Sequence, residues 1–133
     1  MSETTQVLAA LPVFNGLDER SLQAIAILAH EISVPAGTVL IREGDPATSF
    51  YVIVEGSVRV ERDGRAIRSL SEGGFVGEIG VVEGSLRTAT VTCATACEFL
   101  EFGAFELGRV LDTFPTVRAR VDAALTRRPH RDG

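Results

Sequence analysis

The stretch of sequence that decides the fold is VPAGTVLIREGDPATSFYVIVEGSVRVERDGRAIRSLSEGG, residues 34–74. It consists of short runs rich in β-branched residues, and each run ends at a glycine or proline turn signal. The turn signals lie at residues 35–37, 44–46, 55–56, 63–64 and 73–74. Turns at roughly ten-residue spacing predict a roll or barrel of antiparallel strands.

Alternation within these runs predicts which side chains face the interior of the roll. Val58 and Val60 alternate with Arg59 and Glu61, which places the valines inside and the charged residues outside. The same reasoning places Ile67 inside, with its neighbour Arg68 outside. Four arginines punctuate this hairpin, and we interpret them as a solvated face and not as a basic binding cluster: Arg59, Arg62, Arg65 and Arg68.

Helical patterns flank the strands on both sides. Apolar residues at helical spacing predict a helix over residues 18–30, with Asp18 as its N-cap. After two further strands, residues 103–128 return to helical spacing, and Pro115 should separate two helices there. The apolar positions of these last helices are Phe105, Leu107, Leu111, Val117, Val121 and Leu125. The predicted fold is mainly β with flanking α: an antiparallel, jelly-roll-like β-roll of about eight strands, with one helix before it, a short helix within it and two helices after it.

Length and composition narrow the functional classes. A chain of 133 residues suits one domain, and its net charge of -5 disfavours direct binding to nucleic acid. No stretch approaches the roughly 20 apolar residues of a membrane span, and the N-terminus lacks a signal peptide. We therefore expect a cytoplasmic protein that does not bind a membrane. Cys93 and Cys97 are expected to be reduced, buried thiols.

The segment FVGEIGVVEGSLRTATV, residues 75–91, sets Glu78 and Arg87 among glycines and small apolar residues. The run GEIGVV predicts a short helix, whose first amides, at Ile79 and Gly80, would attract an anion. The two charges either form a salt bridge that holds a loop or bind a ligand that needs both. Arg87 suits a singly charged phosphodiester, and an ionised Glu78 accepts a hydrogen bond from a hydroxyl. A 3′,5′-cyclic nucleotide offers both groups.

This segment resembles the phosphate-binding cassette of cyclic-nucleotide-binding domains, which occur in cAMP-receptor transcription factors, kinase regulatory subunits and nucleotide-gated channels. The stretches FNGLDERSLQAIA, VPAGTVLIREGDPATSFYVIVEGSVRV and FGAFELGRVLDTFP extend the resemblance over residues 12–128. It implies that Glu78 binds the ribose 2′-hydroxyl and that Arg87 binds the cyclic phosphate. It also implies that Thr88 can bond the amino group of a guanine, so that cGMP is accepted beside cAMP. The pocket would be completed by the backbone at Gly77, Ile79, Gly80, Thr88 and Ala89.

The expected organisation is a domain over residues 12–128, with short tails at 1–11 and 129–133 and without an effector domain. Only His30 and His130 are present, and no catalytic set is recognisable, so we expect neither an enzyme, a metal site nor a cofactor. The expected partners are a cyclic nucleotide and an effector protein that the sequence does not identify. The apolar stripe of the last helix fits either a lid on the roll or a homodimer seam. The alternative is a degenerate domain that binds no ligand and serves as an interaction or dimerisation module.

Overall fold

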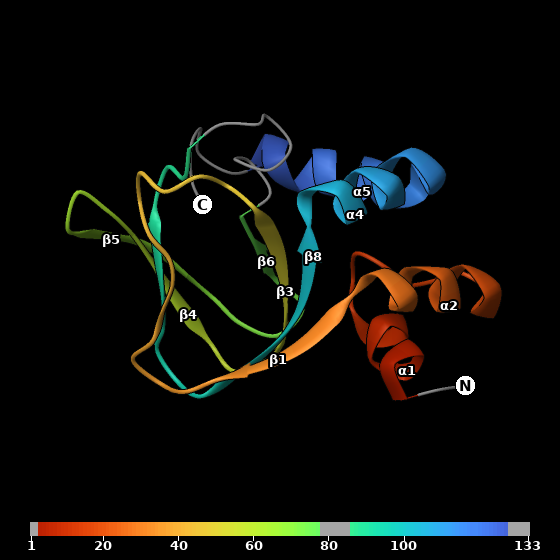
Figure 1. The fold of residues 1–133 in the computed structure, drawn as a ribbon, viewed down its shortest axis with the longest axis horizontal. Coiled ribbons are helices and arrows are strands. Elements are labelled where there is room, and N and C mark those ends of the chain that lie inside the picture. The colour runs from red at the N-terminus through yellow and green to blue at the C-terminus, as the bar shows by residue number, and fades with distance from the viewer. Residues whose placement is uncertain (1–2, 78–85, 128–133) are drawn as a thin grey trace.

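The computed structural model describes residues 3–77 and 86–127, and within them eight strands form two antiparallel four-stranded sheets (Figure 1). One sheet has the order β1-β8-β3-β6 and the other has the order β2-β7-β4-β5. The predicted β-roll is therefore confirmed. The strands are β1 (His30–Val34), β2 (Val39–Ile41), β3 (Ser49–Glu55), β4 (Val58–Arg62), β5 (Arg65–Leu70), β6 (Phe75–Val76), β7 (Thr90–Cys93) and β8 (Cys97–Gly103).

Four helices are described, and all lie on one side of the β1-β8-β3-β6 sheet, opposite the β4–β5 hairpin (Figure 1). They are α1 (Glu3–Ala10), α2 (Glu19–Leu28), α4 (Ala104–Thr113) and α5 (Pro115–Arg127). The α2 N-cap is Asp18, as predicted, and its Oδ1 accepts a hydrogen bond of 2.8 Å from the amide of Ser21. Pro115 opens α5 one residue after α4 ends, which is also as predicted. None of the described helices is long and apolar enough to cross a membrane.

Helix α1 corrects the expectation that residues 1–11 form a tail. Leu8 is fully buried and Leu11 is nearly so, and both belong to the core that the other helices share. A helix of eight residues is too short to be stable alone in water, so packing against α2 must hold it. The described domain therefore begins at α1.

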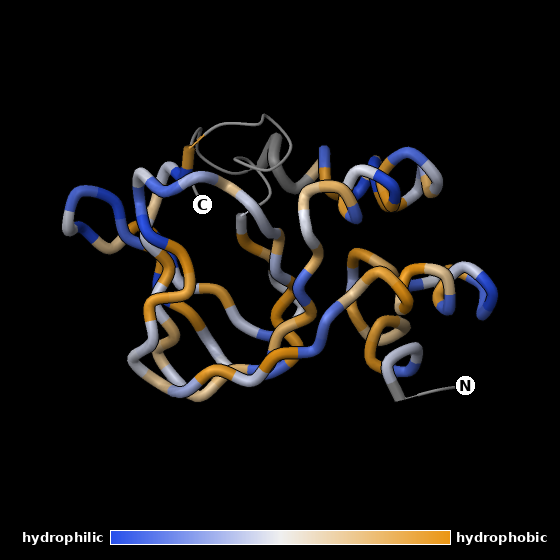
Figure 2. Tube along the Cα trace, in the orientation of Figure 1, coloured by the Kyte–Doolittle hydropathy of each residue, from blue (hydrophilic) through white to orange (hydrophobic). Residues whose placement is uncertain are grey.

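The core has two parts, one on each side of the β1-β8-β3-β6 sheet. The first lies between the two sheets and includes Val58, Val60, Val91 and Phe99. The second lies between the outer face of that sheet and the helices, and includes Phe14, Phe50 and Phe102, whose rings lie in tilted contact. Hydrophobic residues accordingly follow β3, β8 and the helices beside them in Figure 2. Cys93 and Cys97 are buried and free, as predicted.

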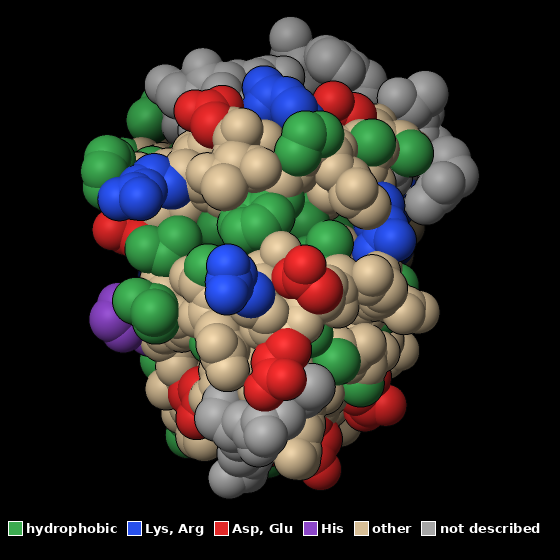
Figure 3. Space-filling view, turned by 90° about the vertical axis from the view of Figure 1, so that its right-hand side faces the viewer, with side chains coloured by type: hydrophobic (Ala, Val, Ile, Leu, Met, Phe, Trp, Pro, Cys, Tyr) green, Lys and Arg blue, Asp and Glu red, His purple; other side chains and the backbone are tan. Residues whose placement is uncertain are grey.

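The apolar stripe of α5 packs within the chain. Val117 and Val121 are buried in the helical core beside Val13 and Phe14. On the neighbouring face of α5, Nη1 of Arg120 lies 2.5 to 3.4 Å from the carbonyl oxygens of residues 12, 13 and 15. Figure 3 views this helical side, where hydrophobic side chains form a band flanked by charged ones. The turn after α1 and the helix α5 are therefore joined by apolar contacts and by hydrogen bonds.

Two predicted interior positions are instead exposed. Phe105 is 69% exposed, with the Arg109 guanidinium 6.0 Å from its ring centroid. Ile67 is 40% exposed, because a register shift between β4 and β5 pairs Val60 with Arg68 and Glu61 with Ala66, which leaves Ile67 as the extra residue. After such a bulge the alternation changes phase, and Arg68 therefore shares the inward face of Val60.

Candidate ligand-binding site

The candidate site lies where β6 ends and the chain returns to β7. Gly77 directly follows β6, and Arg87, Thr88 and Ala89 directly precede β7. The structure therefore brings both ends of the predicted cassette to the same region of the roll. Three of the predicted site residues lie outside the described residues: Glu78, Ile79 and Gly80.

The backbone of Arg87 is fixed by the turn that precedes β3. Its amide donates a hydrogen bond of 2.8 Å to the carbonyl of Asp45, and its carbonyl accepts one of 2.9 Å from the amide of Gly44. Pro46 and Leu86 form a β-bridge next to this pair. The position from which the Arg87 side chain projects is therefore set by a second segment of the chain.

The Arg87 side chain is only 8% exposed, which is unusual for arginine. Nη1 donates to the carbonyl of Gly77 at 3.0 Å, and Nη2 donates to the carbonyl of Ser49 at 2.6 Å. These two backbone carbonyls orient the guanidinium. This geometry suits an anion, because a planar fork with fixed donors can bind a phosphate at two points.

Position 77 requires glycine, because of its backbone conformation and because of the atoms that lie close to it. Its φ is +91°, a region that favours glycine. A Cβ at this position would lie 2.6 Å from Nη1 of Arg87 and 2.9 Å from the carbonyl oxygen of Ser49. Any side chain here would therefore displace the arginine.

The last cassette residues line the inner wall of the roll. Ala89 is buried among the residues between the sheets. The carbonyl of Thr88 accepts a hydrogen bond of 3.2 Å from Nε of Arg62, at the end of β4. The Thr88 hydroxyl is buried and has no hydrogen-bond partner among the described residues. Arg62 is thus part of this region, which corrects its assignment to a solvated face.

Comparison with known proteins decides the family. The sequence profile of the cyclic nucleotide-binding domain matches residues 31–114, which is more than half of the chain. This chain belongs to the cyclic nucleotide-binding domain family. It is 32% identical over 112 residues to a cyclic nucleotide-gated potassium channel of Mesorhizobium japonicum, an alignment that covers 84% of this chain and 31% of the channel.

Solved structures of other proteins resemble the structure of this cyclic nucleotide-binding domain. The regulatory domain of Toxoplasma gondii PKA, crystallised with cAMP, matches with a TM-score of 0.71 and 30% identity over 80% of this chain and 42% of that one. The regulatory subunit of a cAMP-independent protein kinase A from Trypanosoma brucei shares the fold, with a TM-score of 0.83 and 24% identity over 94% of this chain and 47% of that one. The chain covers only 26 to 35% of the length of three curated relatives.

Tyr51 is a polar core residue near Arg87 that the sequence did not indicate. It lies on β3 opposite Glu101 of β8 and belongs to the core between the sheets. Burial, and then the charge and hydrogen bonding of Glu101, raise the pKa of Tyr51, while the nearby charge of Arg87 opposes this shift. Tyr51 therefore remains a neutral hydrogen-bonding group near the arginine at physiological pH.

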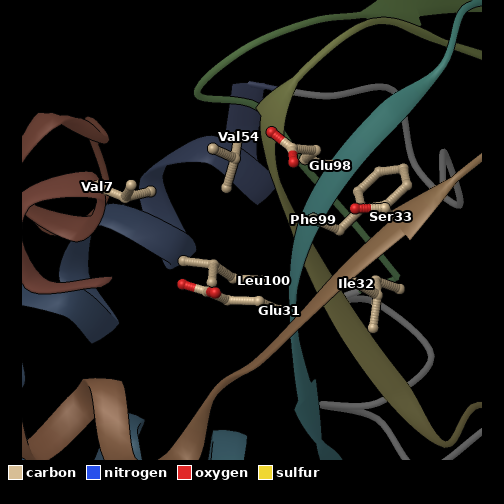
Figure 4. Close-up of a pocket in the computed structure, with 8 residues that line it drawn as sticks. All are labelled: Val7, Glu31, Ile32, Ser33, Val54, Glu98, Phe99 and Leu100. Carbon is tan, nitrogen blue, oxygen red and sulfur yellow. The ribbon is translucent and has the colours of Figure 1, made fainter. Parts of the chain in front are cut away.

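A separate pocket of about 250 Å³ lies between α1 and strands β1, β3 and β8 (Figure 4). Val7, Val54 and Leu100 supply its apolar lining, and Glu31 and Glu98 supply carboxylates. It includes no residue of the predicted cassette. Its acidic lining would also repel a phosphate, so this pocket of the cyclic nucleotide-binding domain is not the anion site.

Sequence reasoning missed the groups that hold Arg87 and Thr88 in place. The carbonyl of Ser49 and the turn at residues 44–45 act through the backbone, so their side chains carry no signal for this role. Arg62 did carry a signal, because it follows Val58 and Val60 at alternate positions and therefore shares their inward face.

Proposed function

We propose that this domain is a sensor that binds cAMP, and also cGMP, and signals by movement of its C-terminal helices. The single observation that carries the proposal is the buried Arg87 fork, aimed by two carbonyls and backed by a glycine that leaves it room. A buried guanidinium whose donors are fixed in this way is suited to an anionic ligand such as a phosphate.

In the proposed complex, Arg87 binds the cyclic phosphate and Glu78 accepts a hydrogen bond from the ribose 2′-hydroxyl. The amides of Ile79 and Gly80 and the backbone at Gly77 complete the phosphate site. The T. gondii relative crystallised with cAMP supports this assignment, as does the name of the M. japonicum channel. The role is binding without catalysis, in a domain that needs no metal and no cofactor.

A conformational change in the cassette must be transmitted to the effector through neighbouring elements of the domain. Helix α4 directly follows β8, and α5 follows α4 after a single residue, so a shift of the cassette can reach α5 through these helices. Because the chain spans only about a third of its channel relative, we propose that an effector, in the same protein or a partner, reads α5. A second copy of the chain is one such partner. Two free buried cysteines fit a reducing, cytoplasmic location.

The second candidate function is an interaction module that binds no cyclic nucleotide. The T. brucei neighbour supports it, because the name of that protein describes it as cAMP-independent although its fold is shared. Under this alternative, Arg87 would serve only to tie β3 to the residues that flank the cassette.

Calorimetric titration with cAMP and with cGMP separates the two functions. Wild-type protein should bind at least one of them, and Arg87→Ala should weaken binding by about 2 to 5 kcal/mol, the cost of removing one partner of a buried charge pair. Arg87→Lys should restore little, because a point charge cannot replace the fork. Arg59→Ala, an exposed arginine on the neighbouring strand β4, is the matched control and should bind normally. Binding to Arg87→Ala within twofold of wild type would reject the cassette assignment.

The ribose contact is tested with a second variant. Glu78→Gln should weaken cAMP more than it weakens 2′-deoxy-cAMP, because the analogue has no hydroxyl to lose. Equal losses for the two ligands would remove Glu78 from the ribose and leave the phosphate assignment standing.

A further inference from the structure

We propose that the outer face of the β1-β8-β3 sheet beside α1 is a docking groove for an extended basic segment of a partner protein, with cationic side chains at alternate positions. The groove consists of the pocket of about 250 Å³ described above and a second hollow of about 450 Å³ that adjoins it. Each is many times the roughly 30 Å³ that one water molecule occupies, so each has room for a side chain. The groove includes no residue of the cassette, so this inference goes beyond the proposed function and does not depend on it.

The helices cover the outer face of this sheet along only part of its strands. Phe50, Leu100 and Phe102 are buried in the core that the sheet shares with the helices. Further along the same face, Ser33 of β1 and Glu98 of β8 are register partners, and both are exposed. The groove is this uncovered end of the sheet, and α1 forms one side of it (Figure 4).

The two hollows follow one another along β1. Ser33 and Glu98 line both hollows, so the hollows are continuous. The β1 side of the first is formed by residues 31–33, and residues 33–35 border the second. This displacement of two residues corresponds to about 6.6 Å along a strand. In an extended segment lying along β1, side chains at alternate positions point the same way at that spacing, so two of them can enter the two hollows.

The charges of the groove select a basic segment. Glu31 lines the first hollow, Glu55 lines the second, and Glu98 lines both. Among the described residues that line the hollows, none is basic. Glu55 and Glu98 are also register partners across β3 and β8, and like charges directly opposite each other destabilise a sheet. A cationic side chain placed between these carboxylates would reduce that repulsion.

The apolar lining selects a cation that is carried on an aliphatic stem. Val7 of α1 lies across the first hollow from Val54 and Leu100 of the sheet (Figure 4). In the second hollow, Val34 and Pro35 supply apolar surface. Arginine and lysine bury their aliphatic stems against such surface while the charged group bonds to a carboxylate. The groove therefore fits a segment with the pattern cation-x-cation.

NMR titration of the isotope-labelled domain with synthetic peptides tests the groove. The probe is a short capped peptide that contains Arg-x-Arg among small uncharged residues. The control peptide has the same composition with the two arginines adjacent, so that in an extended segment they point to opposite sides. The Arg-x-Arg peptide should shift the amide resonances of residues 31–35 and 96–100 and should bind about fivefold more tightly than the control.

Two variants of the protein test the carboxylates. Glu98→Gln removes the charge that both hollows share and keeps the size of the side chain, so it should weaken binding of the Arg-x-Arg peptide by about fivefold. Asp112→Asn, at an exposed carboxylate of α4 outside the groove, changes the net charge by the same amount and is the matched control. It should change the affinity by less than about twofold.

Several outcomes would overturn the inference. Resonances that do not shift, or that shift only outside the groove, would show that the segment does not dock there. Equal affinities for the two peptides, or equal losses in the two variants, would show only a general attraction to a protein of net charge -5. If Glu98→Gln does not fold, the two peptides on the wild-type protein decide the question. The titrations contain no nucleotide, so a failure of cyclic-nucleotide binding would be a separate result.

Discussion

Replacing Gly77 with alanine tests the geometry of the site most directly, because one methyl group meets two constraints at once. The residue has a φ of +91°, and the new Cβ would lie 2.6 Å from Nη1 of Arg87. The backbone conformation alone should cost about 1 to 2 kcal/mol. Displacing Arg87 from the Gly77 carbonyl should cost about 1.5 to 3 kcal/mol more, the range for a hydrogen bond to a charged group. Gly77→Ala should therefore lower the unfolding free energy by about 3 to 5 kcal/mol.

Gly37→Ala is the matched control for this variant. Gly37 has a φ of +87°, and a Cβ there would meet no atom within 4 Å. It should therefore show the backbone cost without the contact. In thermal denaturation followed by circular dichroism, Gly77→Ala should lose roughly 10 °C and Gly37→Ala less than half of that, since about 3 °C corresponds to 1 kcal/mol in a domain of this size. Calorimetry should show weakened cyclic-nucleotide binding for Gly77→Ala alone.

A double-mutant cycle isolates the contact itself. In an Arg87→Ala background the methyl group no longer meets a guanidinium, so Gly77→Ala should cost only about as much as Gly37→Ala does. If Gly77→Ala and Gly37→Ala are equally stable in the wild-type background and bind nucleotide equally well, the guanidinium does not lie against Gly77, and the reasoning that makes Arg87 a preset anion site is wrong.

Three further predictions concern the rest of the molecule. Leu8→Ala should lower the unfolding free energy by about 2 to 5 kcal/mol in a denaturant titration, and a loss under about 1 kcal/mol would mean that α1 is not part of the core. Burial and the neighbouring Cys97 raise the pKa of Cys93 from 9.0 to about 12, so the thiol of the folded protein should resist alkylation by iodoacetamide at pH 8. The unfolding free energy should fall as pH rises above 9.0, because only the unfolded thiol ionises there. Rapid alkylation of Cys93 in the native protein would contradict its burial. Arg120→Met should speed hydrogen exchange in α5 and in residues 12–15 together, whereas Arg118→Met, an exposed arginine of the same helix, should not.

The sequence predicted the roll because its turn signals and its alternation agree over residues 34–74. Where the alternation is interrupted without a turn signal, the prediction of inward and outward faces was wrong. At Ile67 the alternation was read without the bulge, which no residue type announces, and so Ile67 and Arg68 were assigned to the wrong faces. Helix α1 was missed because eight residues carry too few apolar positions to define a period, and its stability comes from contacts that are distant in the sequence.

The candidate site was predictable to the extent that side chains define it. Arg87 was identified from its residue type among small neighbours, and the structure shows it buried and oriented. Its orientation could not be predicted, because carbonyl groups of Gly77 and Ser49 provide it and every residue has a carbonyl. The roles of Glu78, Ile79 and Gly80 remain predictions, since these residues lie outside the described part of the chain.

The bonds of Arg120 have a practical consequence for anyone who builds a biosensor from this domain. Because they join α5 to residues 12–15, more than a hundred positions earlier in the chain, we expect the two flanks of the domain to move together. A donor and an acceptor fluorophore fused to these two flanks would keep a constant separation and give little energy-transfer signal. One fluorophore inserted at the 63–64 turn, on the far side of the roll, and the other placed after α5 would straddle the part of the molecule that we propose to rearrange on nucleotide binding.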